Sequence, residues 1–137
     1  MTKKRGPYKP ASVADCRHCG VEFKFYKSCT RGLYCSTQCR LDYTWLHITK
    51  PGIIAGTLSQ HSIGSLRRFL NERDGRNCSC CKLDTWMGEP IPLDVDHIDG
   101  NHKNNAGANL RYLCPTCHAM QPTSFVNKGL KPRVTTR

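Results

Sequence analysis

The sequence predicts a small α+β protein that is held together by bound metal rather than by a large core. The chain has 137 residues, and only 38% of them are hydrophobic. A domain of this size and composition commonly needs a metal or disulfides for stability. Ten cysteines are present, and most of them form close pairs. Between these pairs, short alternating stretches that are typical of strands are followed by stretches with helical periodicity.

The ends of the chain and its apolar content indicate the compartment. MTKKRGPYKPAS is basic and is not followed by an apolar run, so we expect no secretory signal. The longest uncharged stretch, PGIIAGTLSQHSIGSL, is too short and too polar to span a membrane. We therefore expect a cytoplasmic protein without a membrane partner. In that compartment close cysteine pairs bind metal more often than they form disulfides.

Charge is distributed unevenly along the chain. The net charge is +11, and residues 1–50 carry ten Lys/Arg against three Asp/Glu, which is +7. Residues 78–127 carry three against five, which is −2, and residues 128–137 carry four basic residues and no acidic one. Basic flanks suit a polyanionic partner, and an acidic centre suits a bound cation. The alternative is that the charges serve solubility alone.

These patterns divide the chain into five expected segments. Residues 1–14 form a disordered basic arm, in which Lys3, Lys4 and Arg5 are candidate phosphate contacts. The segments that follow are a metal-binding finger at 15–50, a linker at 51–61, a second metal-binding domain with a leading helix at 62–127, and a basic tail at 128–137.

The finger contains two cysteine pairs and one helix signal. A C-x2-C pair and a C-x3-C pair can place four thiolates around one tetrahedral Zn²⁺; they are Cys16, Cys19, Cys35 and Cys39. VEFKFY alternates as a strand does, and Ser36 is a candidate N-cap for a helix that carries Leu41, Trp45 and Leu46. The order knuckle, hairpin, helix resembles a treble-clef finger. Cys29 is expected to be a spare thiol, the alternative being a replacement ligand.

The leading helix is predicted over SIGSLRRFLNERDG. Ser62 can cap it, Gly75 can end it, and the apolar face contains Ile63, Leu66 and Leu70. On the opposite face, Arg67 and Arg68 either contact phosphate or form a solvated surface.

A second set of cysteines encloses the most polar part of the chain. Two C-x2-C pairs, Cys78/Cys81 and Cys114/Cys117, predict a second structural zinc ion. Cys80 is the alternative to Cys78, but it adjoins Cys81 and cannot easily form a knuckle with it. Between the pairs, PLDVDHI and NLRYLC read as strands joined by the loop IDGNHKNN, and CPTCHAM opens a helix.

VDHIDGN followed by NLRYLCPTCH resembles the HNH nuclease motif of the ββα-metal fold, and the similarity is greatest to small HNH endonucleases of bacteriophages and prophages. The resemblance implies that His97 is the general base, that Asn109 positions it, and that Asp96 and His118 bind one catalytic Mg²⁺ or Mn²⁺ ion. It further implies cleavage of DNA, with 5′-phosphate and 3′-hydroxyl ends, in the cytoplasm of a host cell. Lys103 and Arg111 join the expected DNA contacts.

The residues support this chemistry independently. A neutral histidine can take a proton from water, and a hard cation held by few protein ligands can neutralise a phosphate. Because strand neighbours point to opposite faces, Asp96 and His97 can share a site only if the strand ends there, and Ile98-Asp99-Gly100 is the expected breaking point. Four histidines and three asparagines are expected to be ordinary surface or loop residues: His18, His47, His61, His102, Asn101, Asn104 and Asn105. For His102, which lies in the loop, the alternative is a contact with phosphate.

Two other interpretations remain open. One is a non-catalytic zinc-dependent DNA-binding regulator or assembly factor, and the other is an HNH unit acting on RNA. The sequence also leaves open whether the partner is a second copy of the chain or a phage or host protein.

Overall fold

The computed structural model describes residues 12–26, 32–57 and 62–123. Most of the basic arm, Cys29, part of the linker and the basic tail therefore lie outside the described residues. The chain divides into two compact units, Met1–Thr49 and Lys50–Arg137. None of the helices in the described ranges combines the length and the apolar character needed to cross a bilayer.

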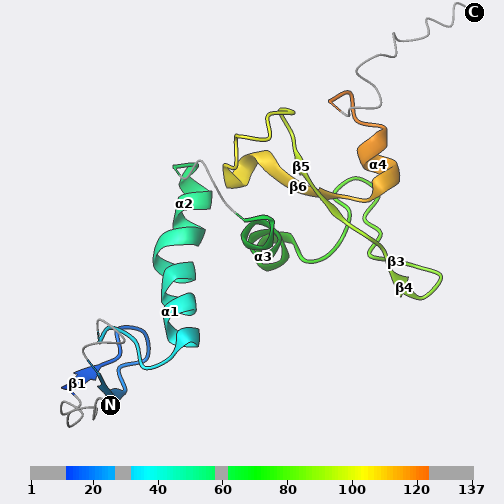
Figure 1. Ribbon diagram of the computed structural model, residues 1–137. Coiled ribbons are helices and arrows are strands. Elements are labelled where there is room, and N and C mark those ends of the chain that lie inside the picture. The colour runs from blue at the N-terminus through cyan, green and yellow to red at the C-terminus, as the bar shows by residue number, and fades with distance from the viewer. Residues whose placement is uncertain (1–11, 27–31, 58–61, 124–137) are drawn as a thin grey trace, which may run out of the picture. The chain divides into compact units, whose positions relative to one another are not determined.

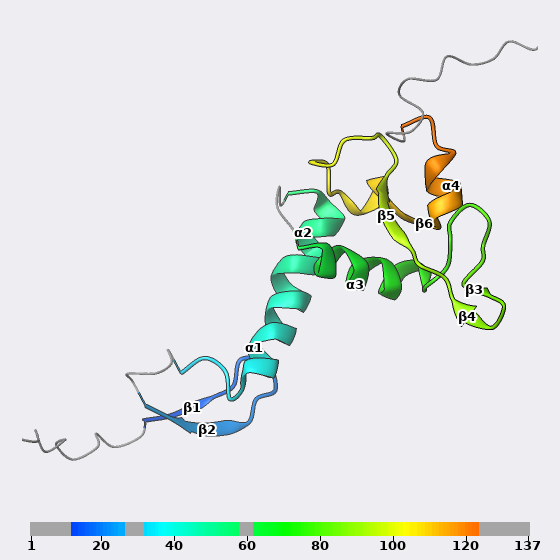
Figure 2. The same cartoon turned by 45° about the vertical axis from the view of Figure 1, so that its right-hand side comes forward.

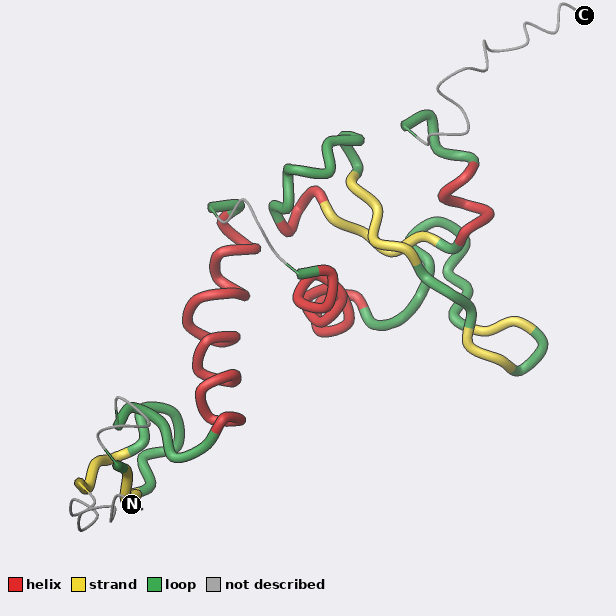
Figure 3. Tube along the Cα trace, in the orientation of Figure 1, coloured by secondary structure: helices red, strands yellow, loops and turns green. Residues whose placement is uncertain are grey.

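The first unit consists of a hairpin and a helix (Figure 3). Strand β1 (Ser12–Asp15) pairs antiparallel with β2 (Glu22–Phe25), which is the strand predicted from VEFKFY. Residues 12–14 thus belong to a strand and not to the disordered arm, because the chain after the Cys16–Cys19 knuckle returns alongside them. Helix α1 (Thr37–Thr44) begins at the predicted cap, where the Cys39 backbone N–H donates to the Ser36 hydroxyl at 3.1 Å, and a π-helical turn (Trp45–Thr49) follows.

Helix α2 (Lys50–Ala55) opens the second unit and replaces the first part of the expected linker. Pro51 lies just after the π-helical turn, and because it has no backbone N–H it cannot donate to a carbonyl of that turn. Gly56 follows the helix with φ +66°, a conformation that glycine adopts without strain. The segment predicted as a linker therefore begins with a short helix.

Helix α3 (Ile63–Asp74) has the predicted ends. The Ser65 backbone N–H donates to the Ser62 hydroxyl at 3.2 Å, and Gly75 follows with φ +77°. Its buried residues are Leu66, Phe69 and Leu70, whereas Ile63 is 58% exposed. Of the three residues expected on the apolar face, Ile63 is exposed because it is the first helical residue, and the packed part of α3 starts at Leu66.

The centre of the second unit is a hairpin with helices against it (Figures 1 and 2). Strand β5 (Asp94–His97) pairs antiparallel with β6 (Leu110–Leu113), and helix α4 (Pro115–Ala119) follows directly, as predicted. Both α3 and α4 contact this hairpin. Its core includes Leu110 and Leu113, which are 1% and 0% exposed.

Two smaller elements complete the second unit. A hairpin of β3 (Thr85–Trp86) and β4 (Glu89–Pro90), which the sequence did not predict, turns through Met87 and Gly88, both with positive φ. A 3-10 turn (Gly107–Asn109) leads into β6. A Cβ atom at Gly107 would lie 2.7 Å from the Phe69 ring, so glycine permits the close approach of α3 to this turn.

Candidate functional site

The second cysteine set forms one cluster beside the β5–β6 hairpin. The thiols of Cys78, Cys81, Cys114 and Cys117 all lie within 4.8 Å of one another, and the Cys81 and Cys114 sulfurs are 3.9 Å apart. Tetrahedral coordination with Zn–S bonds of about 2.3 Å places sulfurs ~3.8 Å apart. The four thiols therefore fit one zinc ion, and Cys80 lies outside the cluster, as its position beside Cys81 predicted.

The first cysteine set is equally compact. The sulfur of Cys19 lies 3.6 Å from that of Cys35 and 3.8 Å from that of Cys39, and the Cys35 and Cys39 sulfurs are 3.4 Å apart. Cys16 completes the cluster from the knuckle after β1. These distances also match the edges of a tetrahedral zinc–sulfur site.

Backbone amides favour the thiolate form of one cysteine in each cluster. Burial raises the pKa of the Cys78 thiol, but the N–H groups of Cys114, Cys81 and Cys80 outweigh burial and lower this pKa to about 6. At Cys16, backbone amides likewise outweigh burial and lower the pKa of the thiol to about 6.

Each cluster also contains a thiol whose pKa is raised. The main cause is a hydrogen bond with a neighbouring thiol, Cys39 for Cys35 and Cys114 for Cys117. Since zinc binds deprotonated cysteine, binding of the ion has to displace the protons of these thiols.

A cavity of about 130 Å³ lies at the end of β5. It brings together Asp96, His97 and His118, although His118 comes from α4 and the other two come from β5. Strand β5 ends at His97, and the chain turns through Gly100 with φ +72°. Consecutive residues can therefore line one cavity, and the expected breaking point is confirmed.

The His118 ring lies between two carboxylates. Its Nδ1 is 3.2 Å from Asp94 Oδ2, and its Nε2 is 3.6 Å from Asp96 Oδ1. A carboxylate only accepts, so a neutral ring that donates from Nδ1 to Asp94 turns the Nε2 lone pair toward Asp96. One nitrogen and one oxygen converge, and this pair suits a divalent cation with open coordination positions.

Asp96 is 6% exposed, and its second oxygen binds an arginine. Arg111 donates from Nε to Asp96 Oδ2 at 2.7 Å and from Nη2 to Gln121 Oε1 at 2.9 Å. The charge of Arg111 made it an expected DNA contact; the structure places its guanidinium against Asp96. There it balances a buried carboxylate, which otherwise carries a high desolvation cost.

The His97 ring is held by a loop asparagine. His97 Nε2 lies 2.9 Å from Asn105 Oδ1, and Asn105 is 9% exposed. Because the amide oxygen only accepts, this bond keeps the proton of a neutral ring on Nε2 and leaves the lone pair on Nδ1. The expectation that Asn105 is an ordinary loop residue was wrong. Its burial distinguishes it, and the sequence carries no sign of that burial.

Asn109 bridges the loop that follows His97. Its Oδ1 accepts from the Asp99 backbone N–H at 3.1 Å, and its Nδ2 donates to Asp99 Oδ1 at 2.9 Å and to the Asn104 carbonyl at 2.8 Å. Asp99 also accepts from the Asn104 amide and the Asn101 backbone, and these hydrogen bonds lower the pKa of its carboxyl. Asp99 therefore organises the turn, and Asn109 braces it.

His102 and the residues expected to contact DNA that the structure describes do not lie together. His102, expected to be an ordinary loop residue, lines the same cavity as His97. Arg68 pairs with Glu72, with Nε and Oε1 3.1 Å apart, whereas Arg67 lines a separate cavity. Lys103 is exposed in the loop. The candidates Lys3, Lys4 and Arg5 lie outside the described residues.

Comparison with known proteins gives a match to one curated protein sequence. No family model and no solved structure matches the chain. Over 57 residues the chain is 54% identical to the H-N-H endonuclease F-TflIV of Escherichia phage T5. The match covers 41% of this chain and 25% of that protein, so the chain spans about a quarter of the length of the curated relative it matches. The resemblance to phage HNH endonucleases is thereby confirmed.

Proposed function

We propose that the chain is a metal-dependent HNH-type endonuclease that hydrolyses phosphodiester bonds of DNA. The observation that carries this proposal is the single cavity lined by Asp96, His97 and His118. It combines a positioned imidazole with an oxygen and a nitrogen suited to a hard cation. Similarity to a phage H-N-H endonuclease supports the same reaction class.

In the proposed reaction His97 acts as the general base. Nδ1 takes a proton from a water molecule while the water oxygen attacks the phosphorus, and the bond from phosphorus to the 3′ oxygen breaks. The products are a 5′-phosphate and a 3′-hydroxyl, whose proton comes from solvent. Asn105 keeps the other ring proton on Nε2, and Asn109 braces the turn that follows the base.

Asp96 and His118 are the proposed ligands of the catalytic ion. A Mg²⁺ or Mn²⁺ ion held there would neutralise the phosphate and the departing 3′ oxygen. Asp94 fixes the ring of His118, and Arg111 balances the charge of Asp96. Two protein ligands leave most of the coordination shell to water and phosphate, as Mg²⁺ prefers.

The cysteine clusters are proposed to hold structural zinc. His118 directly follows Cys117, so an ion bound by Cys117 fixes the direction in which His118 points.

For residues 15–50 we propose a treble-clef-like finger, because a knuckle, a hairpin and a capped helix follow in that order. Residues 62–127 are the proposed nuclease domain, and the basic arm and tail are proposed to contact DNA in the cytoplasm.

Nicking of supercoiled plasmid by the zinc-loaded protein tests this function. We expect cleavage with added Mg²⁺, none without it, and a loss of about 10²–10⁴-fold in His97→Ala. His47→Ala is the matched control, because His47 lies in the first unit and its ring contacts Tyr43. A zinc-loaded wild-type protein that binds DNA but does not cleave it, whichever divalent ion is added, would support the non-catalytic regulator instead.

A further inference from the structure

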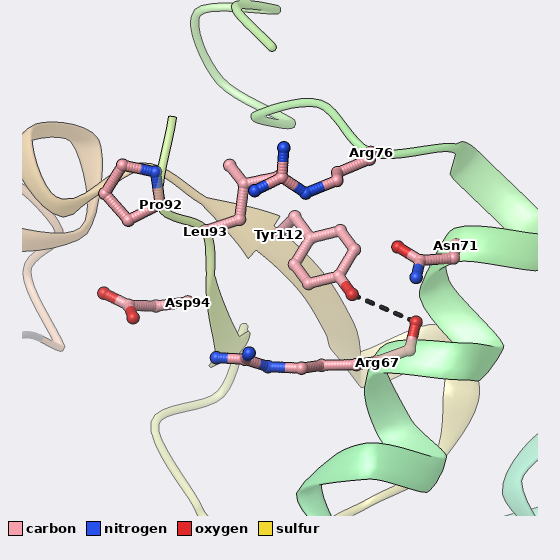
Figure 4. Close-up of a pocket in the computed structure, with 7 residues that line it drawn as sticks. All are labelled: Arg67, Asn71, Arg76, Pro92, Leu93, Asp94 and Tyr112. Carbon is pink, nitrogen blue, oxygen red and sulfur yellow. Dashed lines mark hydrogen bonds between the residues drawn. The ribbon is translucent and has the colours of Figure 1, made fainter. Parts of the chain in front are cut away.

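A second cavity, of about 260 Å³, lies between α3 and the β5–β6 hairpin (Figure 4). Arg67 and Asn71 face it from one side of α3, four residues apart, and Arg76 reaches it from just beyond the helix. In Figure 4 the two arginine side chains lie on either side of the Tyr112 ring.

The arginines that the structure describes in this unit separate into two groups. Arg68, Arg73 and Arg111 each pair with a carboxylate. Within the described ranges, Arg67 and Arg76 form no such pair, and both line this cavity. The lining holds these two cations and one carboxylate, Asp94, so the cavity keeps a net positive charge and favours an anionic ligand.

Two hydrogen bonds to backbone carbonyls hold side chains of the cavity wall in place. Arg76 donates from Nη2 to the Ile91 carbonyl at 2.9 Å, which uses one of its five N–H groups. Tyr112 donates its hydroxyl to the Arg67 carbonyl at 3.0 Å and so joins α3 to β6. Burial raises the pKa of Tyr112, whereas the charges of Arg67 and Arg76 act in the opposite direction, so both cations lie near the same phenol.

The chemistry of the lining favours a phosphate over a nucleobase. Tyr112 is 3% exposed, so its ring has no free face on which a base could stack. Guanidinium groups and the Asn71 amide supply N–H donors, and guanidinium matches the geometry of phosphate oxygens.

The cavity also adjoins the proposed catalytic centre. Asp94 lines it, and the same carboxylate holds His118 through Nδ1 at 3.2 Å. The single negative charge of Asp94 is outnumbered by the two arginines. A ligand in this cavity is therefore separated from the proposed metal ligand His118 by one side chain.

We propose that Arg67 and Arg76, together with Asn71, form a subsite for a backbone phosphate that neighbours the cleaved phosphate on DNA. This proposal rests on the proposed function, because the ligand is the same DNA. The subsite contributes to affinity and to the placement of the strand, and it reads no base sequence.

The test compares adjacent arginines of one helix. Affinity for a fluorescent DNA duplex is measured by anisotropy without added Mg²⁺, so that no turnover occurs, for the wild type, Arg67→Ala, Arg76→Ala and the control Arg68→Ala. We expect the first two variants to bind roughly tenfold more weakly and Arg68→Ala to bind within about twofold of wild type. The slope of log affinity against log salt should fall by about 0.9 in the first two variants, as for the loss of one phosphate contact.

A scan with methylphosphonates, which replace one charged phosphate at a time, then locates the contact. At one phosphate of the duplex, the methylphosphonate should weaken DNA binding by the wild type and by Arg68→Ala but have no effect on DNA binding by Arg67→Ala. Zinc content and circular dichroism check folding, and Arg67→Gln provides a second variant of similar length. Truncating the Arg67 side chain does not remove the Arg67 backbone carbonyl, so Tyr112 can still donate its hydroxyl to it and join α3 to β6.

The possible failures are distinguishable. If wild type and Arg68→Ala bind and cleave DNA while folded Arg67→Ala and Arg76→Ala keep the same affinity and salt slope, the subsite is overturned and the nuclease proposal stands. A changed sequence preference in Arg67→Ala, with no methylphosphonate position losing its effect, would overturn the phosphate assignment. A wild type that neither binds nor cleaves DNA would overturn both proposals.

Discussion

Replacing Asn105 with alanine tests whether the loop prepares His97 for proton transfer. The variant removes the acceptor 2.9 Å from His97 Nε2. The ring then has no partner that keeps its proton on Nε2, and Nδ1 carries the lone pair for only part of the time. Removing such a buried hydrogen bond costs about 1–2 kcal/mol, which corresponds to a roughly 5- to 30-fold lower kcat. This loss is smaller than the ~10²–10⁴-fold expected when the base itself is removed.

Single-turnover cleavage of an end-labelled duplex with saturating Mg²⁺ measures this loss without product release. Asn101→Ala is the matched control, because Asn101 lies in the same loop and its side chain accepts from the Lys103 backbone N–H and not from His97. Asn105→Asp adds a second readout that a merely structural role would not change. It keeps an oxygen acceptor and adds a negative charge that stabilises the protonated imidazole, so the acidic limb of the pH–rate profile should move to higher pH.

Cleavage by Asn105→Ala at the wild-type rate, while His97→Ala does not cleave, would rule out a role of Asn105 in positioning the proton of His97. An unchanged pH–rate profile in Asn105→Asp would also rule it out, since the ring would then not sense the side chain at position 105.

Three further predictions concern the metal sites. Cys114→Ser should bind one zinc ion fewer and lose the fold around the β5–β6 hairpin, because structural zinc supplies folding energy. The control Cys80→Ser should keep both the zinc ion and the fold. Metal analysis measures the zinc content and circular dichroism measures the fold. His118→Ala should keep its zinc but raise the Mg²⁺ concentration for half-maximal cleavage about 10- to 100-fold, as a Mg²⁺ titration would show. Arg111→Ala should lose about 3 kcal/mol of stability, because Asp96 stays buried without a counter-charge. Added Mg²⁺ should raise the Tm of Arg111→Ala more than that of wild type; an equal rise would argue against Asp96 as a ligand.

Features that depend on short spacings were readable from the sequence. A C-x2-C pair brings two thiols together whatever the rest of the chain does, so both clusters were predicted. Likewise, the caps at Ser36 and Ser62 depend only on the residues three positions later. The return of the chain after β5 placed His118 near Asp96 once the strand–loop–strand–helix order was known.

Features that depend on contacts between distant elements were not readable. Arg73 donates to the Gly107 and Leu110 carbonyls, which lie on the far side of the loop. Arg67 and Arg68 look equivalent in the sequence, yet only Arg67 lines the cavity beside the hairpin, because the direction of each side chain is set by how α3 packs. Asn105 is one of several loop asparagines, and only the folded loop places it against His97.

The role of His97 in DNA hydrolysis is measured most directly by the single-turnover rate of DNA cleavage by wild type and His97→Ala, matched for zinc content and for DNA affinity, with Mg²⁺ in excess. We predict that both proteins bind the duplex equally while the cleavage rate of His97→Ala is lower by about 10²–10⁴-fold. Equal rates for the two proteins would rule out His97 as the general base, because hydrolysis would then proceed without the imidazole in the cavity that Asp96 and His118 share.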